Sequence, residues 1–237
     1  MRSDPAGSPN LIYPGAEYPI GAALEIEWFG HACFRITGSG GISIVTDPFD
    51  GRDLGYKTPD VAADIVLVSH EHFDHNKVNV VKGGPAVIRS AGLHRVKGID
   101  VKGIQSYHDD AKGSKRGKNV IYSFELDGIA IAHLGDLGHV LSEAEAREIG
   151  RVDVVMIPVG GYFTIGPREA DRVLGLIRPR VAIPMHYKTP AIDFPISPVE
   201  DFLKGKANVR RVGSNVLRLG REDLPGETQI VVLDYPR

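Results

Sequence analysis

Four side chains that bind divalent cations lie within residues 70–75 of the 237-residue chain, which read His-Glu-His-Phe-Asp-His. Neutral imidazole and carboxylate are the ligands that hold zinc, manganese and non-haem iron in proteins. Because alternate residues of an extended segment face the same way, His70 and His72 can bind one ion. Asp74 and His75, shifted in phase, can then face a second ion. A solvated His-rich loop or a pair of core histidines is the alternative, which this density of ligands disfavours.

An apolar segment directly precedes this hexapeptide. Residues 65–69 read Ile-Val-Leu-Val-Ser, and a run of β-branched residues that ends in a polar one predicts a buried strand. The carboxyl end of that strand then delivers the ligands. Together, the strand and the His-x-His-x-Asp-His pattern resemble the signature of the metallo-β-lactamase superfamily.

The resemblance continues downstream and runs from Leu24 to Thr189. His108 lies where the family has the third imidazole of its first metal site. Asp136, which follows Gly135 at the end of a predicted strand, matches the carboxylate that bridges the two ions. The resemblance therefore implies two metal ions and these ligands: His70, His72, Asp74, His75, His108, Asp136 and His186.

Three further motifs narrow the resemblance within the superfamily. Trp-Phe-Gly-His at residues 28–31, Tyr-His at 107–108 and Met-His-Tyr at 185–187 resemble the branch of ascorbate-6-phosphate lactonase and the phospholipase D that cleaves N-acylphosphatidylethanolamine. The oxygen-reducing diiron members carry Glu where this chain has His72, so the resemblance favours a hydrolase over a redox enzyme. The sequence also lacks the long insertion with which RNA-cutting members clamp nucleic acid.

Two bridged metal ions would supply the nucleophile. A hydroxide shared between two divalent ions roughly 3.5 to 4 Å apart is nucleophilic at neutral pH, because ligation lowers the pKa of water from about 15.7 towards about 7. No serine nucleophile is needed, and the sequence contains no Gly-x-Ser-x-Gly elbow. Asp74 can ligate an ion and also hydrogen-bond the hydroxide, so it is the candidate for proton transfer to the leaving group.

We therefore expect a dinuclear metal-dependent hydrolase that cleaves an ester, lactone or phosphodiester of a small, anionic metabolite, with zinc as the first choice of metal and manganese or iron as alternatives. A phospholipase D-like or nucleotide phosphodiesterase is the alternative enzyme. A non-catalytic metal-binding sensor or scaffold is the alternative of another class, and the presence of Asp136 argues against it.

Other polar residues can support the metal ions. Ligating imidazoles need their second ring nitrogen anchored, and Asp47, at the end of an early predicted strand, can provide this or can simply start a turn before Pro48. Three histidines are further candidates for such support, each with a plainer alternative in a loop or in a packed strand: His31, His133 and His139.

A cationic segment follows His108. Residues 112–118 contain four Lys and Arg side chains, of which Lys115 and Arg116 can receive a substrate phosphate, although charge runs in hairpin loops are often only solvated. Tyr162, in a Gly-rich segment after a predicted strand, can wall the substrate pocket or belong to an ordinary connection.

Composition limits the partners. Positive and negative residues nearly balance, 28 against 30, so the chain creates no overall field that would gather nucleic acid or an anionic membrane. The single cysteine, Cys33, excludes an internal disulfide and indicates a small buried hydrophobic residue. Without an apolar run of roughly 18 residues or a signal pattern, we expect a cytoplasmic protein with a small-molecule substrate and no membrane span.

The elements that position these residues are mostly strands. Residues 1–22, rich in Pro, Gly, Ser and Ala, predict a loosely ordered arm, followed by one domain over residues 23–237. Helices are predicted after the capping box of Ser142 and Glu145 and from Pro167 onward. Strands are predicted at residues 24–36, 42–46, 65–69, 86–89, 101–107, 120–126, 129–133, 152–158, 181–184 and 229–233.

This order of elements predicts the fold class. With 42% hydrophobic residues, a chain of this length can bury a full core. We expect an α/β fold, a four-layer αββα sandwich of two mostly antiparallel or mixed sheets with outer helices, as the resemblance also implies. All the ligands should gather along one edge of the sheets.

Overall fold

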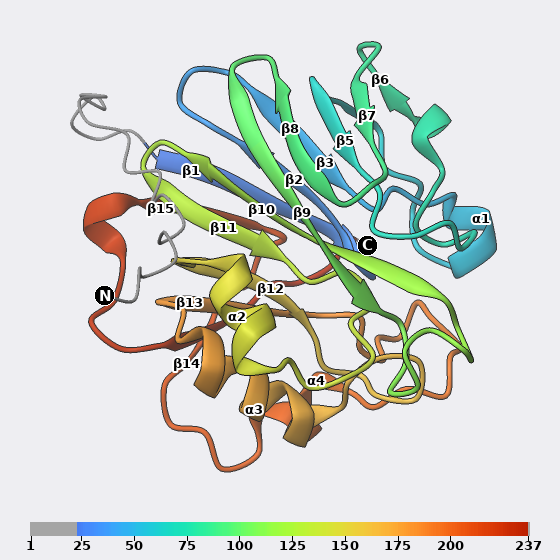
Figure 1. Cartoon of the computed structure of the whole chain (residues 1–237), viewed down its shortest axis with the longest axis vertical. Helices are drawn as coiled ribbons and strands as arrows, with labels where there is room; N and C mark the ends of the chain where they lie inside the picture. The colour runs from blue at the N-terminus through green and yellow to red at the C-terminus, as the bar shows by residue number, and fades with distance from the viewer. Residues whose placement is uncertain (1–22, 237) are drawn as a thin grey trace, which may run out of the picture.

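Two β-sheets packed face to face form the centre of the protein (Figure 1). The computed structural model describes residues 23–236, so the arm predicted for residues 1–22 lies outside the described residues. The six-stranded sheet has its strands in the order β15 (Val216–Gly220), β1 (Ala23–Gly30), β2 (Cys33–Thr37), β3 (Ser43–Thr46), β5 (Ile65–Leu67) and β7 (Ala86–Ile88).

The eight-stranded sheet carries the second half of the fold. Its strands lie in the order β14 (Val209–Arg211), β16 (Gln229–Val232), β13 (Val181–Met185), β12 (Val154–Pro158), β11 (Ile129–His133), β10 (Lys118–Leu126), β9 (Ile99–Tyr107) and β8 (Gly92–Val96). Both sheets are mixed, because β3, β5 and β7 run parallel in the first, and β11, β12, β13, β16 and β14 run parallel in the second.

The parallel arrangement explains why the central strands of the eight-stranded sheet are apolar and why polar segments gather at one edge. The central strands β12 and β13 are buried over their whole length, as is typical of parallel strands that are covered on both faces. The carboxyl ends of parallel strands lie at the same edge of a sheet. Polar segments that directly follow these strands are therefore brought together.

The main apolar core lies between the two sheets. Along β1, buried residues alternate with partly exposed ones, so Leu24, Ile26 and Trp28 are buried in this core. Tyr122 of β10 and Ile131 of β11 belong to the same apolar cluster. This period of two is typical of a strand with one face buried.

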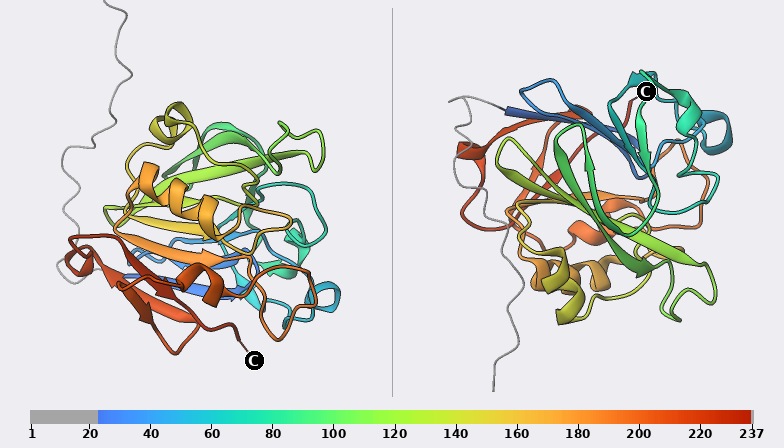
Figure 2. Two further views of the ribbon diagram at one scale, coloured as in Figure 1. Left: turned by 90° about the horizontal axis from the view of Figure 1, so that it is seen from below. Right: turned by 45° about the horizontal axis from the view of Figure 1, so that its top comes forward.

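Helices and short elements form the outer layers (Figure 2). On the outer face of the eight-stranded sheet lie α2 (Glu143–Ile149), α3 (Pro167–Ile177) and α4 (Val199–Leu203). The outer face of the six-stranded sheet has a thinner cover, in which α1 (Gly51–Leu54) and the paired strands β4 (Val61–Ala62) and β6 (Val81–Lys82) enclose a second apolar cluster. Two short 3-10 helices complete the described elements: η1 (Val78–Val80) and η2 (Arg221–Asp223).

The predicted fold class is confirmed, and both predicted helices are present. The capping box at α2 is formed, since Ser142 Oγ accepts from the Glu145 amide at 3.2 Å and Glu145 Oε2 accepts from the Ser142 amide at 2.7 Å. No helix among the described residues is long and apolar enough to cross a membrane.

The strand predicted over residues 24–36 is wrong in one respect, because it is two strands. Gly30, with φ at 104°, and His31, with φ at 53°, turn the chain between β1 and β2. Such left-handed backbone is rare outside glycine, and an apolar run gives no warning of it. Several short or solvent-facing strands were not predicted from the sequence: β4, β6, β8, β14 and β15.

Candidate metal centre

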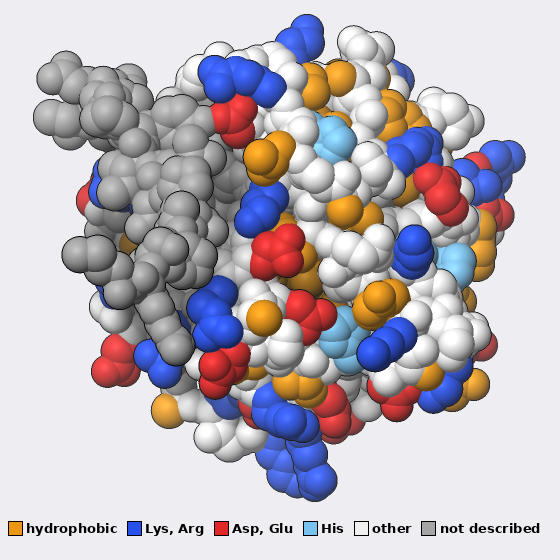
Figure 3. Space-filling model, viewed as in Figure 1, with side chains coloured by type: hydrophobic (Ala, Val, Ile, Leu, Met, Phe, Trp, Pro, Cys, Tyr) orange, Lys and Arg blue, Asp and Glu red, His pale blue; other side chains and the backbone are white. Residues whose placement is uncertain are grey.

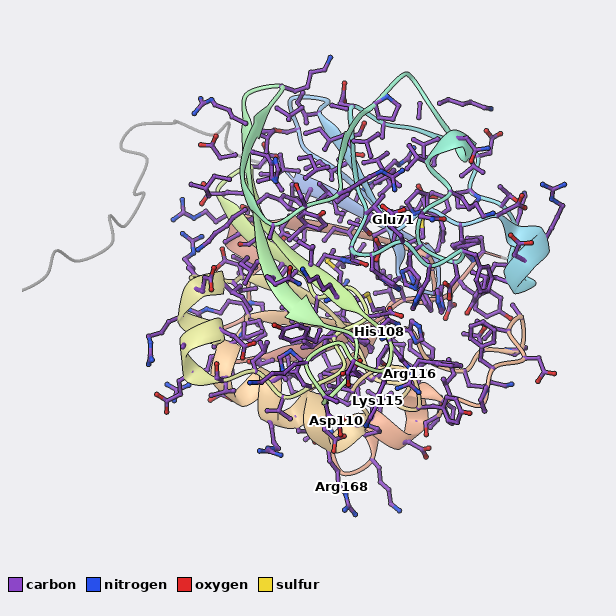
Figure 4. The ribbon with its side chains drawn as sticks, turned by 45° about the vertical axis from the view of Figure 1, so that its right-hand side comes forward. Glu71, His108, Asp110, Lys115, Arg116 and Arg168 are labelled. Carbon is purple, nitrogen blue, oxygen red and sulfur yellow. The ribbon has the colours of Figure 1, made fainter. Side chains whose placement is uncertain are left out.

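Four chain segments that follow strands of the two sheets meet at one place. Residues 70–75 follow β5 of the first sheet, and His108 follows β9 of the second. Asp136 and His186 follow the parallel strands β11 and β13. The side-chain view labels His108 beside the loop that carries Asp110, Lys115 and Arg116 (Figure 4).

Three histidines form one group of potential ligands. One ring nitrogen of each of His70, His72 and His108 lies within 4.8 Å of the others, and His70 Nε2 is 3.0 Å from His72 Nδ1. His70 and His108 are buried, whereas His72 is exposed. This is the trio predicted to hold the first ion.

A second group lies beside the first. His75, His186 and His31 form a buried trio whose ligand atoms also lie within 4.8 Å of one another. Asp74 joins it, with Oδ2 at 3.7 Å from His75 Nε2. The two groups are in contact, because His70 and His75 also form a group of potential ligands with Asp136. The remaining carboxylate of the hexapeptide, Glu71, instead pairs with Arg89 at 2.7 Å.

Asp136 lies between the two groups. Its Oδ2 atom is 3.2 Å from both His108 Nε2 and His186 Nε2. The same oxygen is 3.3 Å from His75 Nε2 and 3.9 Å from His70 Nε2. One carboxylate oxygen therefore contacts imidazoles of both groups.

Unpartnered atoms at this point fit a metal centre. His75 Nε2 and Asp136 Oδ1 are buried and have no hydrogen-bond partner among the described residues. Leaving a buried polar atom unsatisfied costs about 1–3 kcal/mol, and a divalent cation is the partner that both an imidazole nitrogen and a carboxylate oxygen accept. Six imidazoles and two carboxylates surround this centre, a donor set that fits divalent metal ions.

The electrostatics of the centre favour the same use. Burial lowers the pKa of His70 to about 3, so its ring is neutral and its nitrogen is free to ligate at pH 7. Although burial raises the pKa of the Asp136 carboxyl, His186 and His75 hold it well below its ordinary value. Burial lowers the pKa of His75, but Asp136 and Asp74 raise it well above its ordinary value. The carboxylates thus favour positive charge at the point where the ring nitrogens converge.

Asp47 and Ser69 fix the orientation of two of these histidines. Asp47 Oδ2 lies 3.0 Å from His75 Nδ1 and accepts from Ser69 Oγ at 2.7 Å, while Oδ1 accepts from the Ser69 amide at 2.7 Å. Ser69 Oγ in turn lies 2.9 Å from His70 Nδ1. Sequence reasoning named Asp47 but missed Ser69, although its place between the strand and His70 was a usable signal.

His31 lies inside the centre. Its Nε2 atom is 3.1 Å from Asp74 Oδ2, and its ring centroid is 4.0 Å from that of His186. The His31 carbonyl accepts from Trp28 Nε1 and from the His186 amide, both at 3.1 Å, which holds the turn in place. Burial lowers the pKa of His31 to about 4, so the ring is neutral.

The other two candidate histidines form their hydrogen bonds elsewhere. His133 Nε2 lies 2.9 Å from the Ala32 carbonyl, and its Nδ1 accepts from the Gly135 amide at 3.2 Å. His139 Nδ1 lies 3.1 Å from the Val140 carbonyl. Neither ring hydrogen-bonds a predicted metal ligand, so each has the plainer structural role that its neighbourhood in the sequence also allowed.

Asn119 positions the segment that carries Asp136. Its Oδ1 accepts from the Asp136 amide at 3.0 Å, and its Nδ2 donates to the Leu134 carbonyl at 2.9 Å. A Cβ atom on Gly135, where φ is 54°, would lie 2.4 Å from Asn119 Oδ1, so this turn requires glycine. Sequence reasoning missed Asn119, because an isolated buried amide has no recognisable pattern.

A cavity of about 360 Å³ opens onto the centre. Its lining includes Asp136 and His186 of the centre, which we call its floor, and three phenylalanines, which we call part of its walls: Phe73, Phe163 and Phe194. The walls also carry the two predicted cationic residues, which belong to the loop after His108: Lys115 and Arg116.

The predicted substrate-binding residues differ in their surroundings. Lys115 Nζ lies 2.7 Å from Asp110 Oδ1, so its charge already has a partner. Arg116 makes no ion pair with any residue of the described chain, and its guanidinium lies 5.6 Å from the centroid of the Phe163 ring. Tyr162 is exposed and lines a neighbouring hollow of about 470 Å³ rather than the cavity over Asp136.

Comparison with known proteins identifies relatives. A family model described as a β-lactamase superfamily domain matches residues 25–186. A UPF0173 metal-dependent hydrolase of Pyrococcus furiosus is 32% identical over 195 residues, which cover 70% of this chain and 85% of the relative. Its counterpart in Cupriavidus taiwanensis is 32% identical over 235 residues, covering 78% of this chain and 81% of the relative.

A solved structure gives the same result. It is a protein of Thermotoga maritima assigned as a Zn-dependent hydrolase of the metallo-β-lactamase superfamily, and it is 45% identical to this chain. The two superpose with a TM-score of 0.76, over 90% of this chain and 100% of the other.

Proposed function

Because the chain belongs to the metallo-β-lactamase superfamily, in its UPF0173 family of metal-dependent hydrolases, we propose that it is a dinuclear enzyme that cleaves an ester, lactone or phosphodiester bond of a small metabolite. The observation that carries this proposal is the place of Asp136 Oδ2, at 3.2 Å from imidazole nitrogens of both histidine groups. A carboxylate in that position can bridge two cations.

The residues divide the work between two ions. One ion would be held by His70, His72 and His108. The other would be held by Asp74, His75 and His186, and Asp136 would be shared between the two ions. Two divalent cations so held supply a water nucleophile that is ionised near neutral pH and polarise the oxygen of the scissile bond. Zinc is the first choice, since imidazole and carboxylate suit it and the Thermotoga maritima relative is assigned as Zn-dependent.

Asp74 is the proposed proton carrier. Although burial raises its pKa, His75 and the hydrogen bond from His31 hold it well below its ordinary value, so the carboxylate is ionised at neutral pH. An ionised carboxylate beside the nucleophile can accept its proton and deliver it to the leaving oxygen. The 3.1 Å contact with His31 Nε2 fixes the Asp74 side chain for that transfer.

The reaction class is tested by a substrate screen. Zinc-loaded protein should hydrolyse members of a panel of aryl esters, lactones and bis-aryl phosphodiesters, and removal of metal with a chelator should abolish that turnover. Preference for lactones would support the lactonase-like branch, and preference for phosphodiesters would support the phosphodiesterase alternative. Turnover that survives complete metal removal would contradict the proposal.

Metal stoichiometry gives a second prediction. Protein loaded with excess zinc is expected to hold close to two ions per chain, because two ligand groups share one carboxylate. His186→Ala should lower the content to about one ion, since it removes a ligand of the second group alone. Elemental analysis after gel filtration measures both values.

A matched histidine variant controls for nonspecific loss. His94 lies on β8, where its Nε2 is 2.9 Å from the Ser90 carbonyl, and His94→Gln should retain two ions. A well-loaded wild-type protein that holds at most one ion per chain would contradict the two-ion site.

A further inference from the structure

We propose that the cavity over the metal centre selects substrates that join an aromatic or other bulky apolar group to an anionic group, and that Arg116 binds the anion. This inference rests on the proposed function for the position of the reacting bond, which must lie at Asp136 and His186 on the cavity floor. It goes further by assigning the walls of the cavity to the two ends of the substrate.

We infer that the substrate has an apolar end, because three phenylalanines surround the cavity. Phe163 and Phe194 stand edge to face with ring centroids 5.6 Å apart, and Phe194 also lies edge to face with His31 of the centre at 6.0 Å. Phe73 is 50% exposed, although it lies between the ligands His72 and Asp74. Apolar rings open to water beside a reactive centre gain by covering an apolar ligand.

We infer that the substrate has an anionic end, because one cation of the cavity walls lacks an acidic partner within the described chain. The Lys115 ammonium is paired with Asp110 at 2.7 Å, whereas the Arg116 guanidinium makes no ion pair with the described residues and lies 5.6 Å from the centroid of the Phe163 ring. A guanidinium presents a planar fork of donors that matches carboxylate and phosphate oxygens. Stacked near Phe163, it can hold an anion next to an aromatic group.

Hydrogen bonds within the protein fix the backbone of the loop that carries Arg116. The buried Asp109 carboxylate accepts four backbone amides of this loop, with Oδ1 bonded to Ala111 and Gly113 at 2.8 and 2.9 Å. Its Oδ2 accepts from Lys115 at 3.0 Å and from Arg116 at 2.7 Å. The backbone that carries Arg116 is therefore fixed before a ligand arrives, which reduces the entropy cost of binding. Figure 4 labels Arg116, Lys115 and Asp110 on this loop, next to His108.

Positive and negative side chains are mixed over most of the face that Figure 3 presents. This mixture is in line with a net charge of −2. Mixed surface charges attract no particular ligand. The unpaired guanidinium beside the cavity is distinguished by its place and not by the overall field.

Three hydroxamates test the inference by binding alone, because the hydroxamate group chelates the metal while its substituent occupies the cavity. Acetohydroxamate carries only a methyl group. Benzohydroxamate replaces it by a phenyl ring, and 4-carboxybenzohydroxamate adds a carboxylate to that ring. Calorimetry with zinc-loaded protein should give dissociation constants that fall about tenfold with the ring and about tenfold again with the carboxylate. The 4-phosphono analogue shows whether phosphate is preferred to carboxylate.

Variants assign each gain to a wall of the cavity. Arg116→Gln should abolish the gain from the carboxylate and keep the gain from the ring, whereas Phe194→Ala should do the reverse. Lys112→Gln is the matched control, because it removes one charge from an exposed position of the same loop that does not line the cavity. It should leave both gains unchanged.

The outcomes separate the two proposals. If acetohydroxamate binds but the carboxylate brings no gain, or if that gain survives in Arg116→Gln, the assignment of Arg116 is wrong while the metal centre stands. If the ring brings no gain, the apolar half of the inference is wrong. If acetohydroxamate itself does not bind the zinc-treated protein, the metal site on which both proposals rest is overturned.

Discussion

Replacing Asp136 by Asn is expected to lower turnover by at least about a thousandfold while the fold persists. The substitution keeps the size of the side chain but removes the negative charge that lies 3.2 to 3.3 Å from three imidazole nitrogens. A neutral amide cannot bridge two cations, so the second ion should be lost or displaced. Steady-state kinetics, elemental analysis and circular dichroism together measure activity, metal content and fold.

The control is a carboxylate of the same type outside the centre. Asp171 lies on α3, where it pairs with Lys206 at 3.0 Å, and Asp171→Asn should retain wild-type turnover. Exposed ion pairs contribute little to stability, typically about 0–1 kcal/mol. An Asp136→Asn protein that keeps two ions and near wild-type turnover would refute the bridging role.

Replacing Asp47 by Ala is expected to weaken metal binding by about 10–100-fold, the usual effect of removing a group that anchors a ligating imidazole. Asp47 Oδ2 lies 3.0 Å from His75 Nδ1 and accepts a hydrogen bond from Ser69 Oγ, which in turn contacts His70 Nδ1. The metal-free protein should also lose stability, because the buried Ser69 amide and His75 Nδ1 lose their partner, at about 1–3 kcal/mol for each unsatisfied group. Competition with a chelator and urea unfolding of the metal-free form measure the two effects.

Asp64 provides a matched control at the opposite end of the same strands. Its Oδ2 accepts from the amide and the hydroxyl of Ser43 at 3.0 and 3.1 Å, so Asp64, like Asp47, binds the amide and the hydroxyl of one serine, although through one oxygen instead of two. Asp64→Ala should therefore cost stability without changing metal affinity. An unchanged chelator competition curve for Asp47→Ala would show that the anchor does not tune the metal site.

The sequence by itself determined the elements whose signals are local. The apolar run at residues 65–67 is β5, the Ser142 capping box begins α2, and Pro167 begins α3. The hexapeptide could be recognised for the same reason, because three of the nine histidines and one aspartate of the chain lie within six residues. Each of these patterns depends on neighbours within one turn of chain.

Only the tertiary structure decided which distant residues meet. Ser69 and Asn119 are ordinary polar residues in the sequence, and they became parts of the centre because β5 and β10 bring them to His70 and Asp136. His31 sits at a turn that no local pattern announced, and it reaches Asp74 across 43 residues.

The tertiary structure also decided which of Lys115 and Arg116 is free to bind an anion. Both are cations of one loop, and their sequence context is alike. Lys115 has a partner in Asp110, whereas Arg116 lies over Phe163, a residue that a separate loop supplies. Local spacing sets the period of strands, caps and ligand motifs, but the pairing of strands far apart in the chain sets which of their ends share a site. That pairing depends on the packing of whole sheets, which no short segment of the sequence encodes.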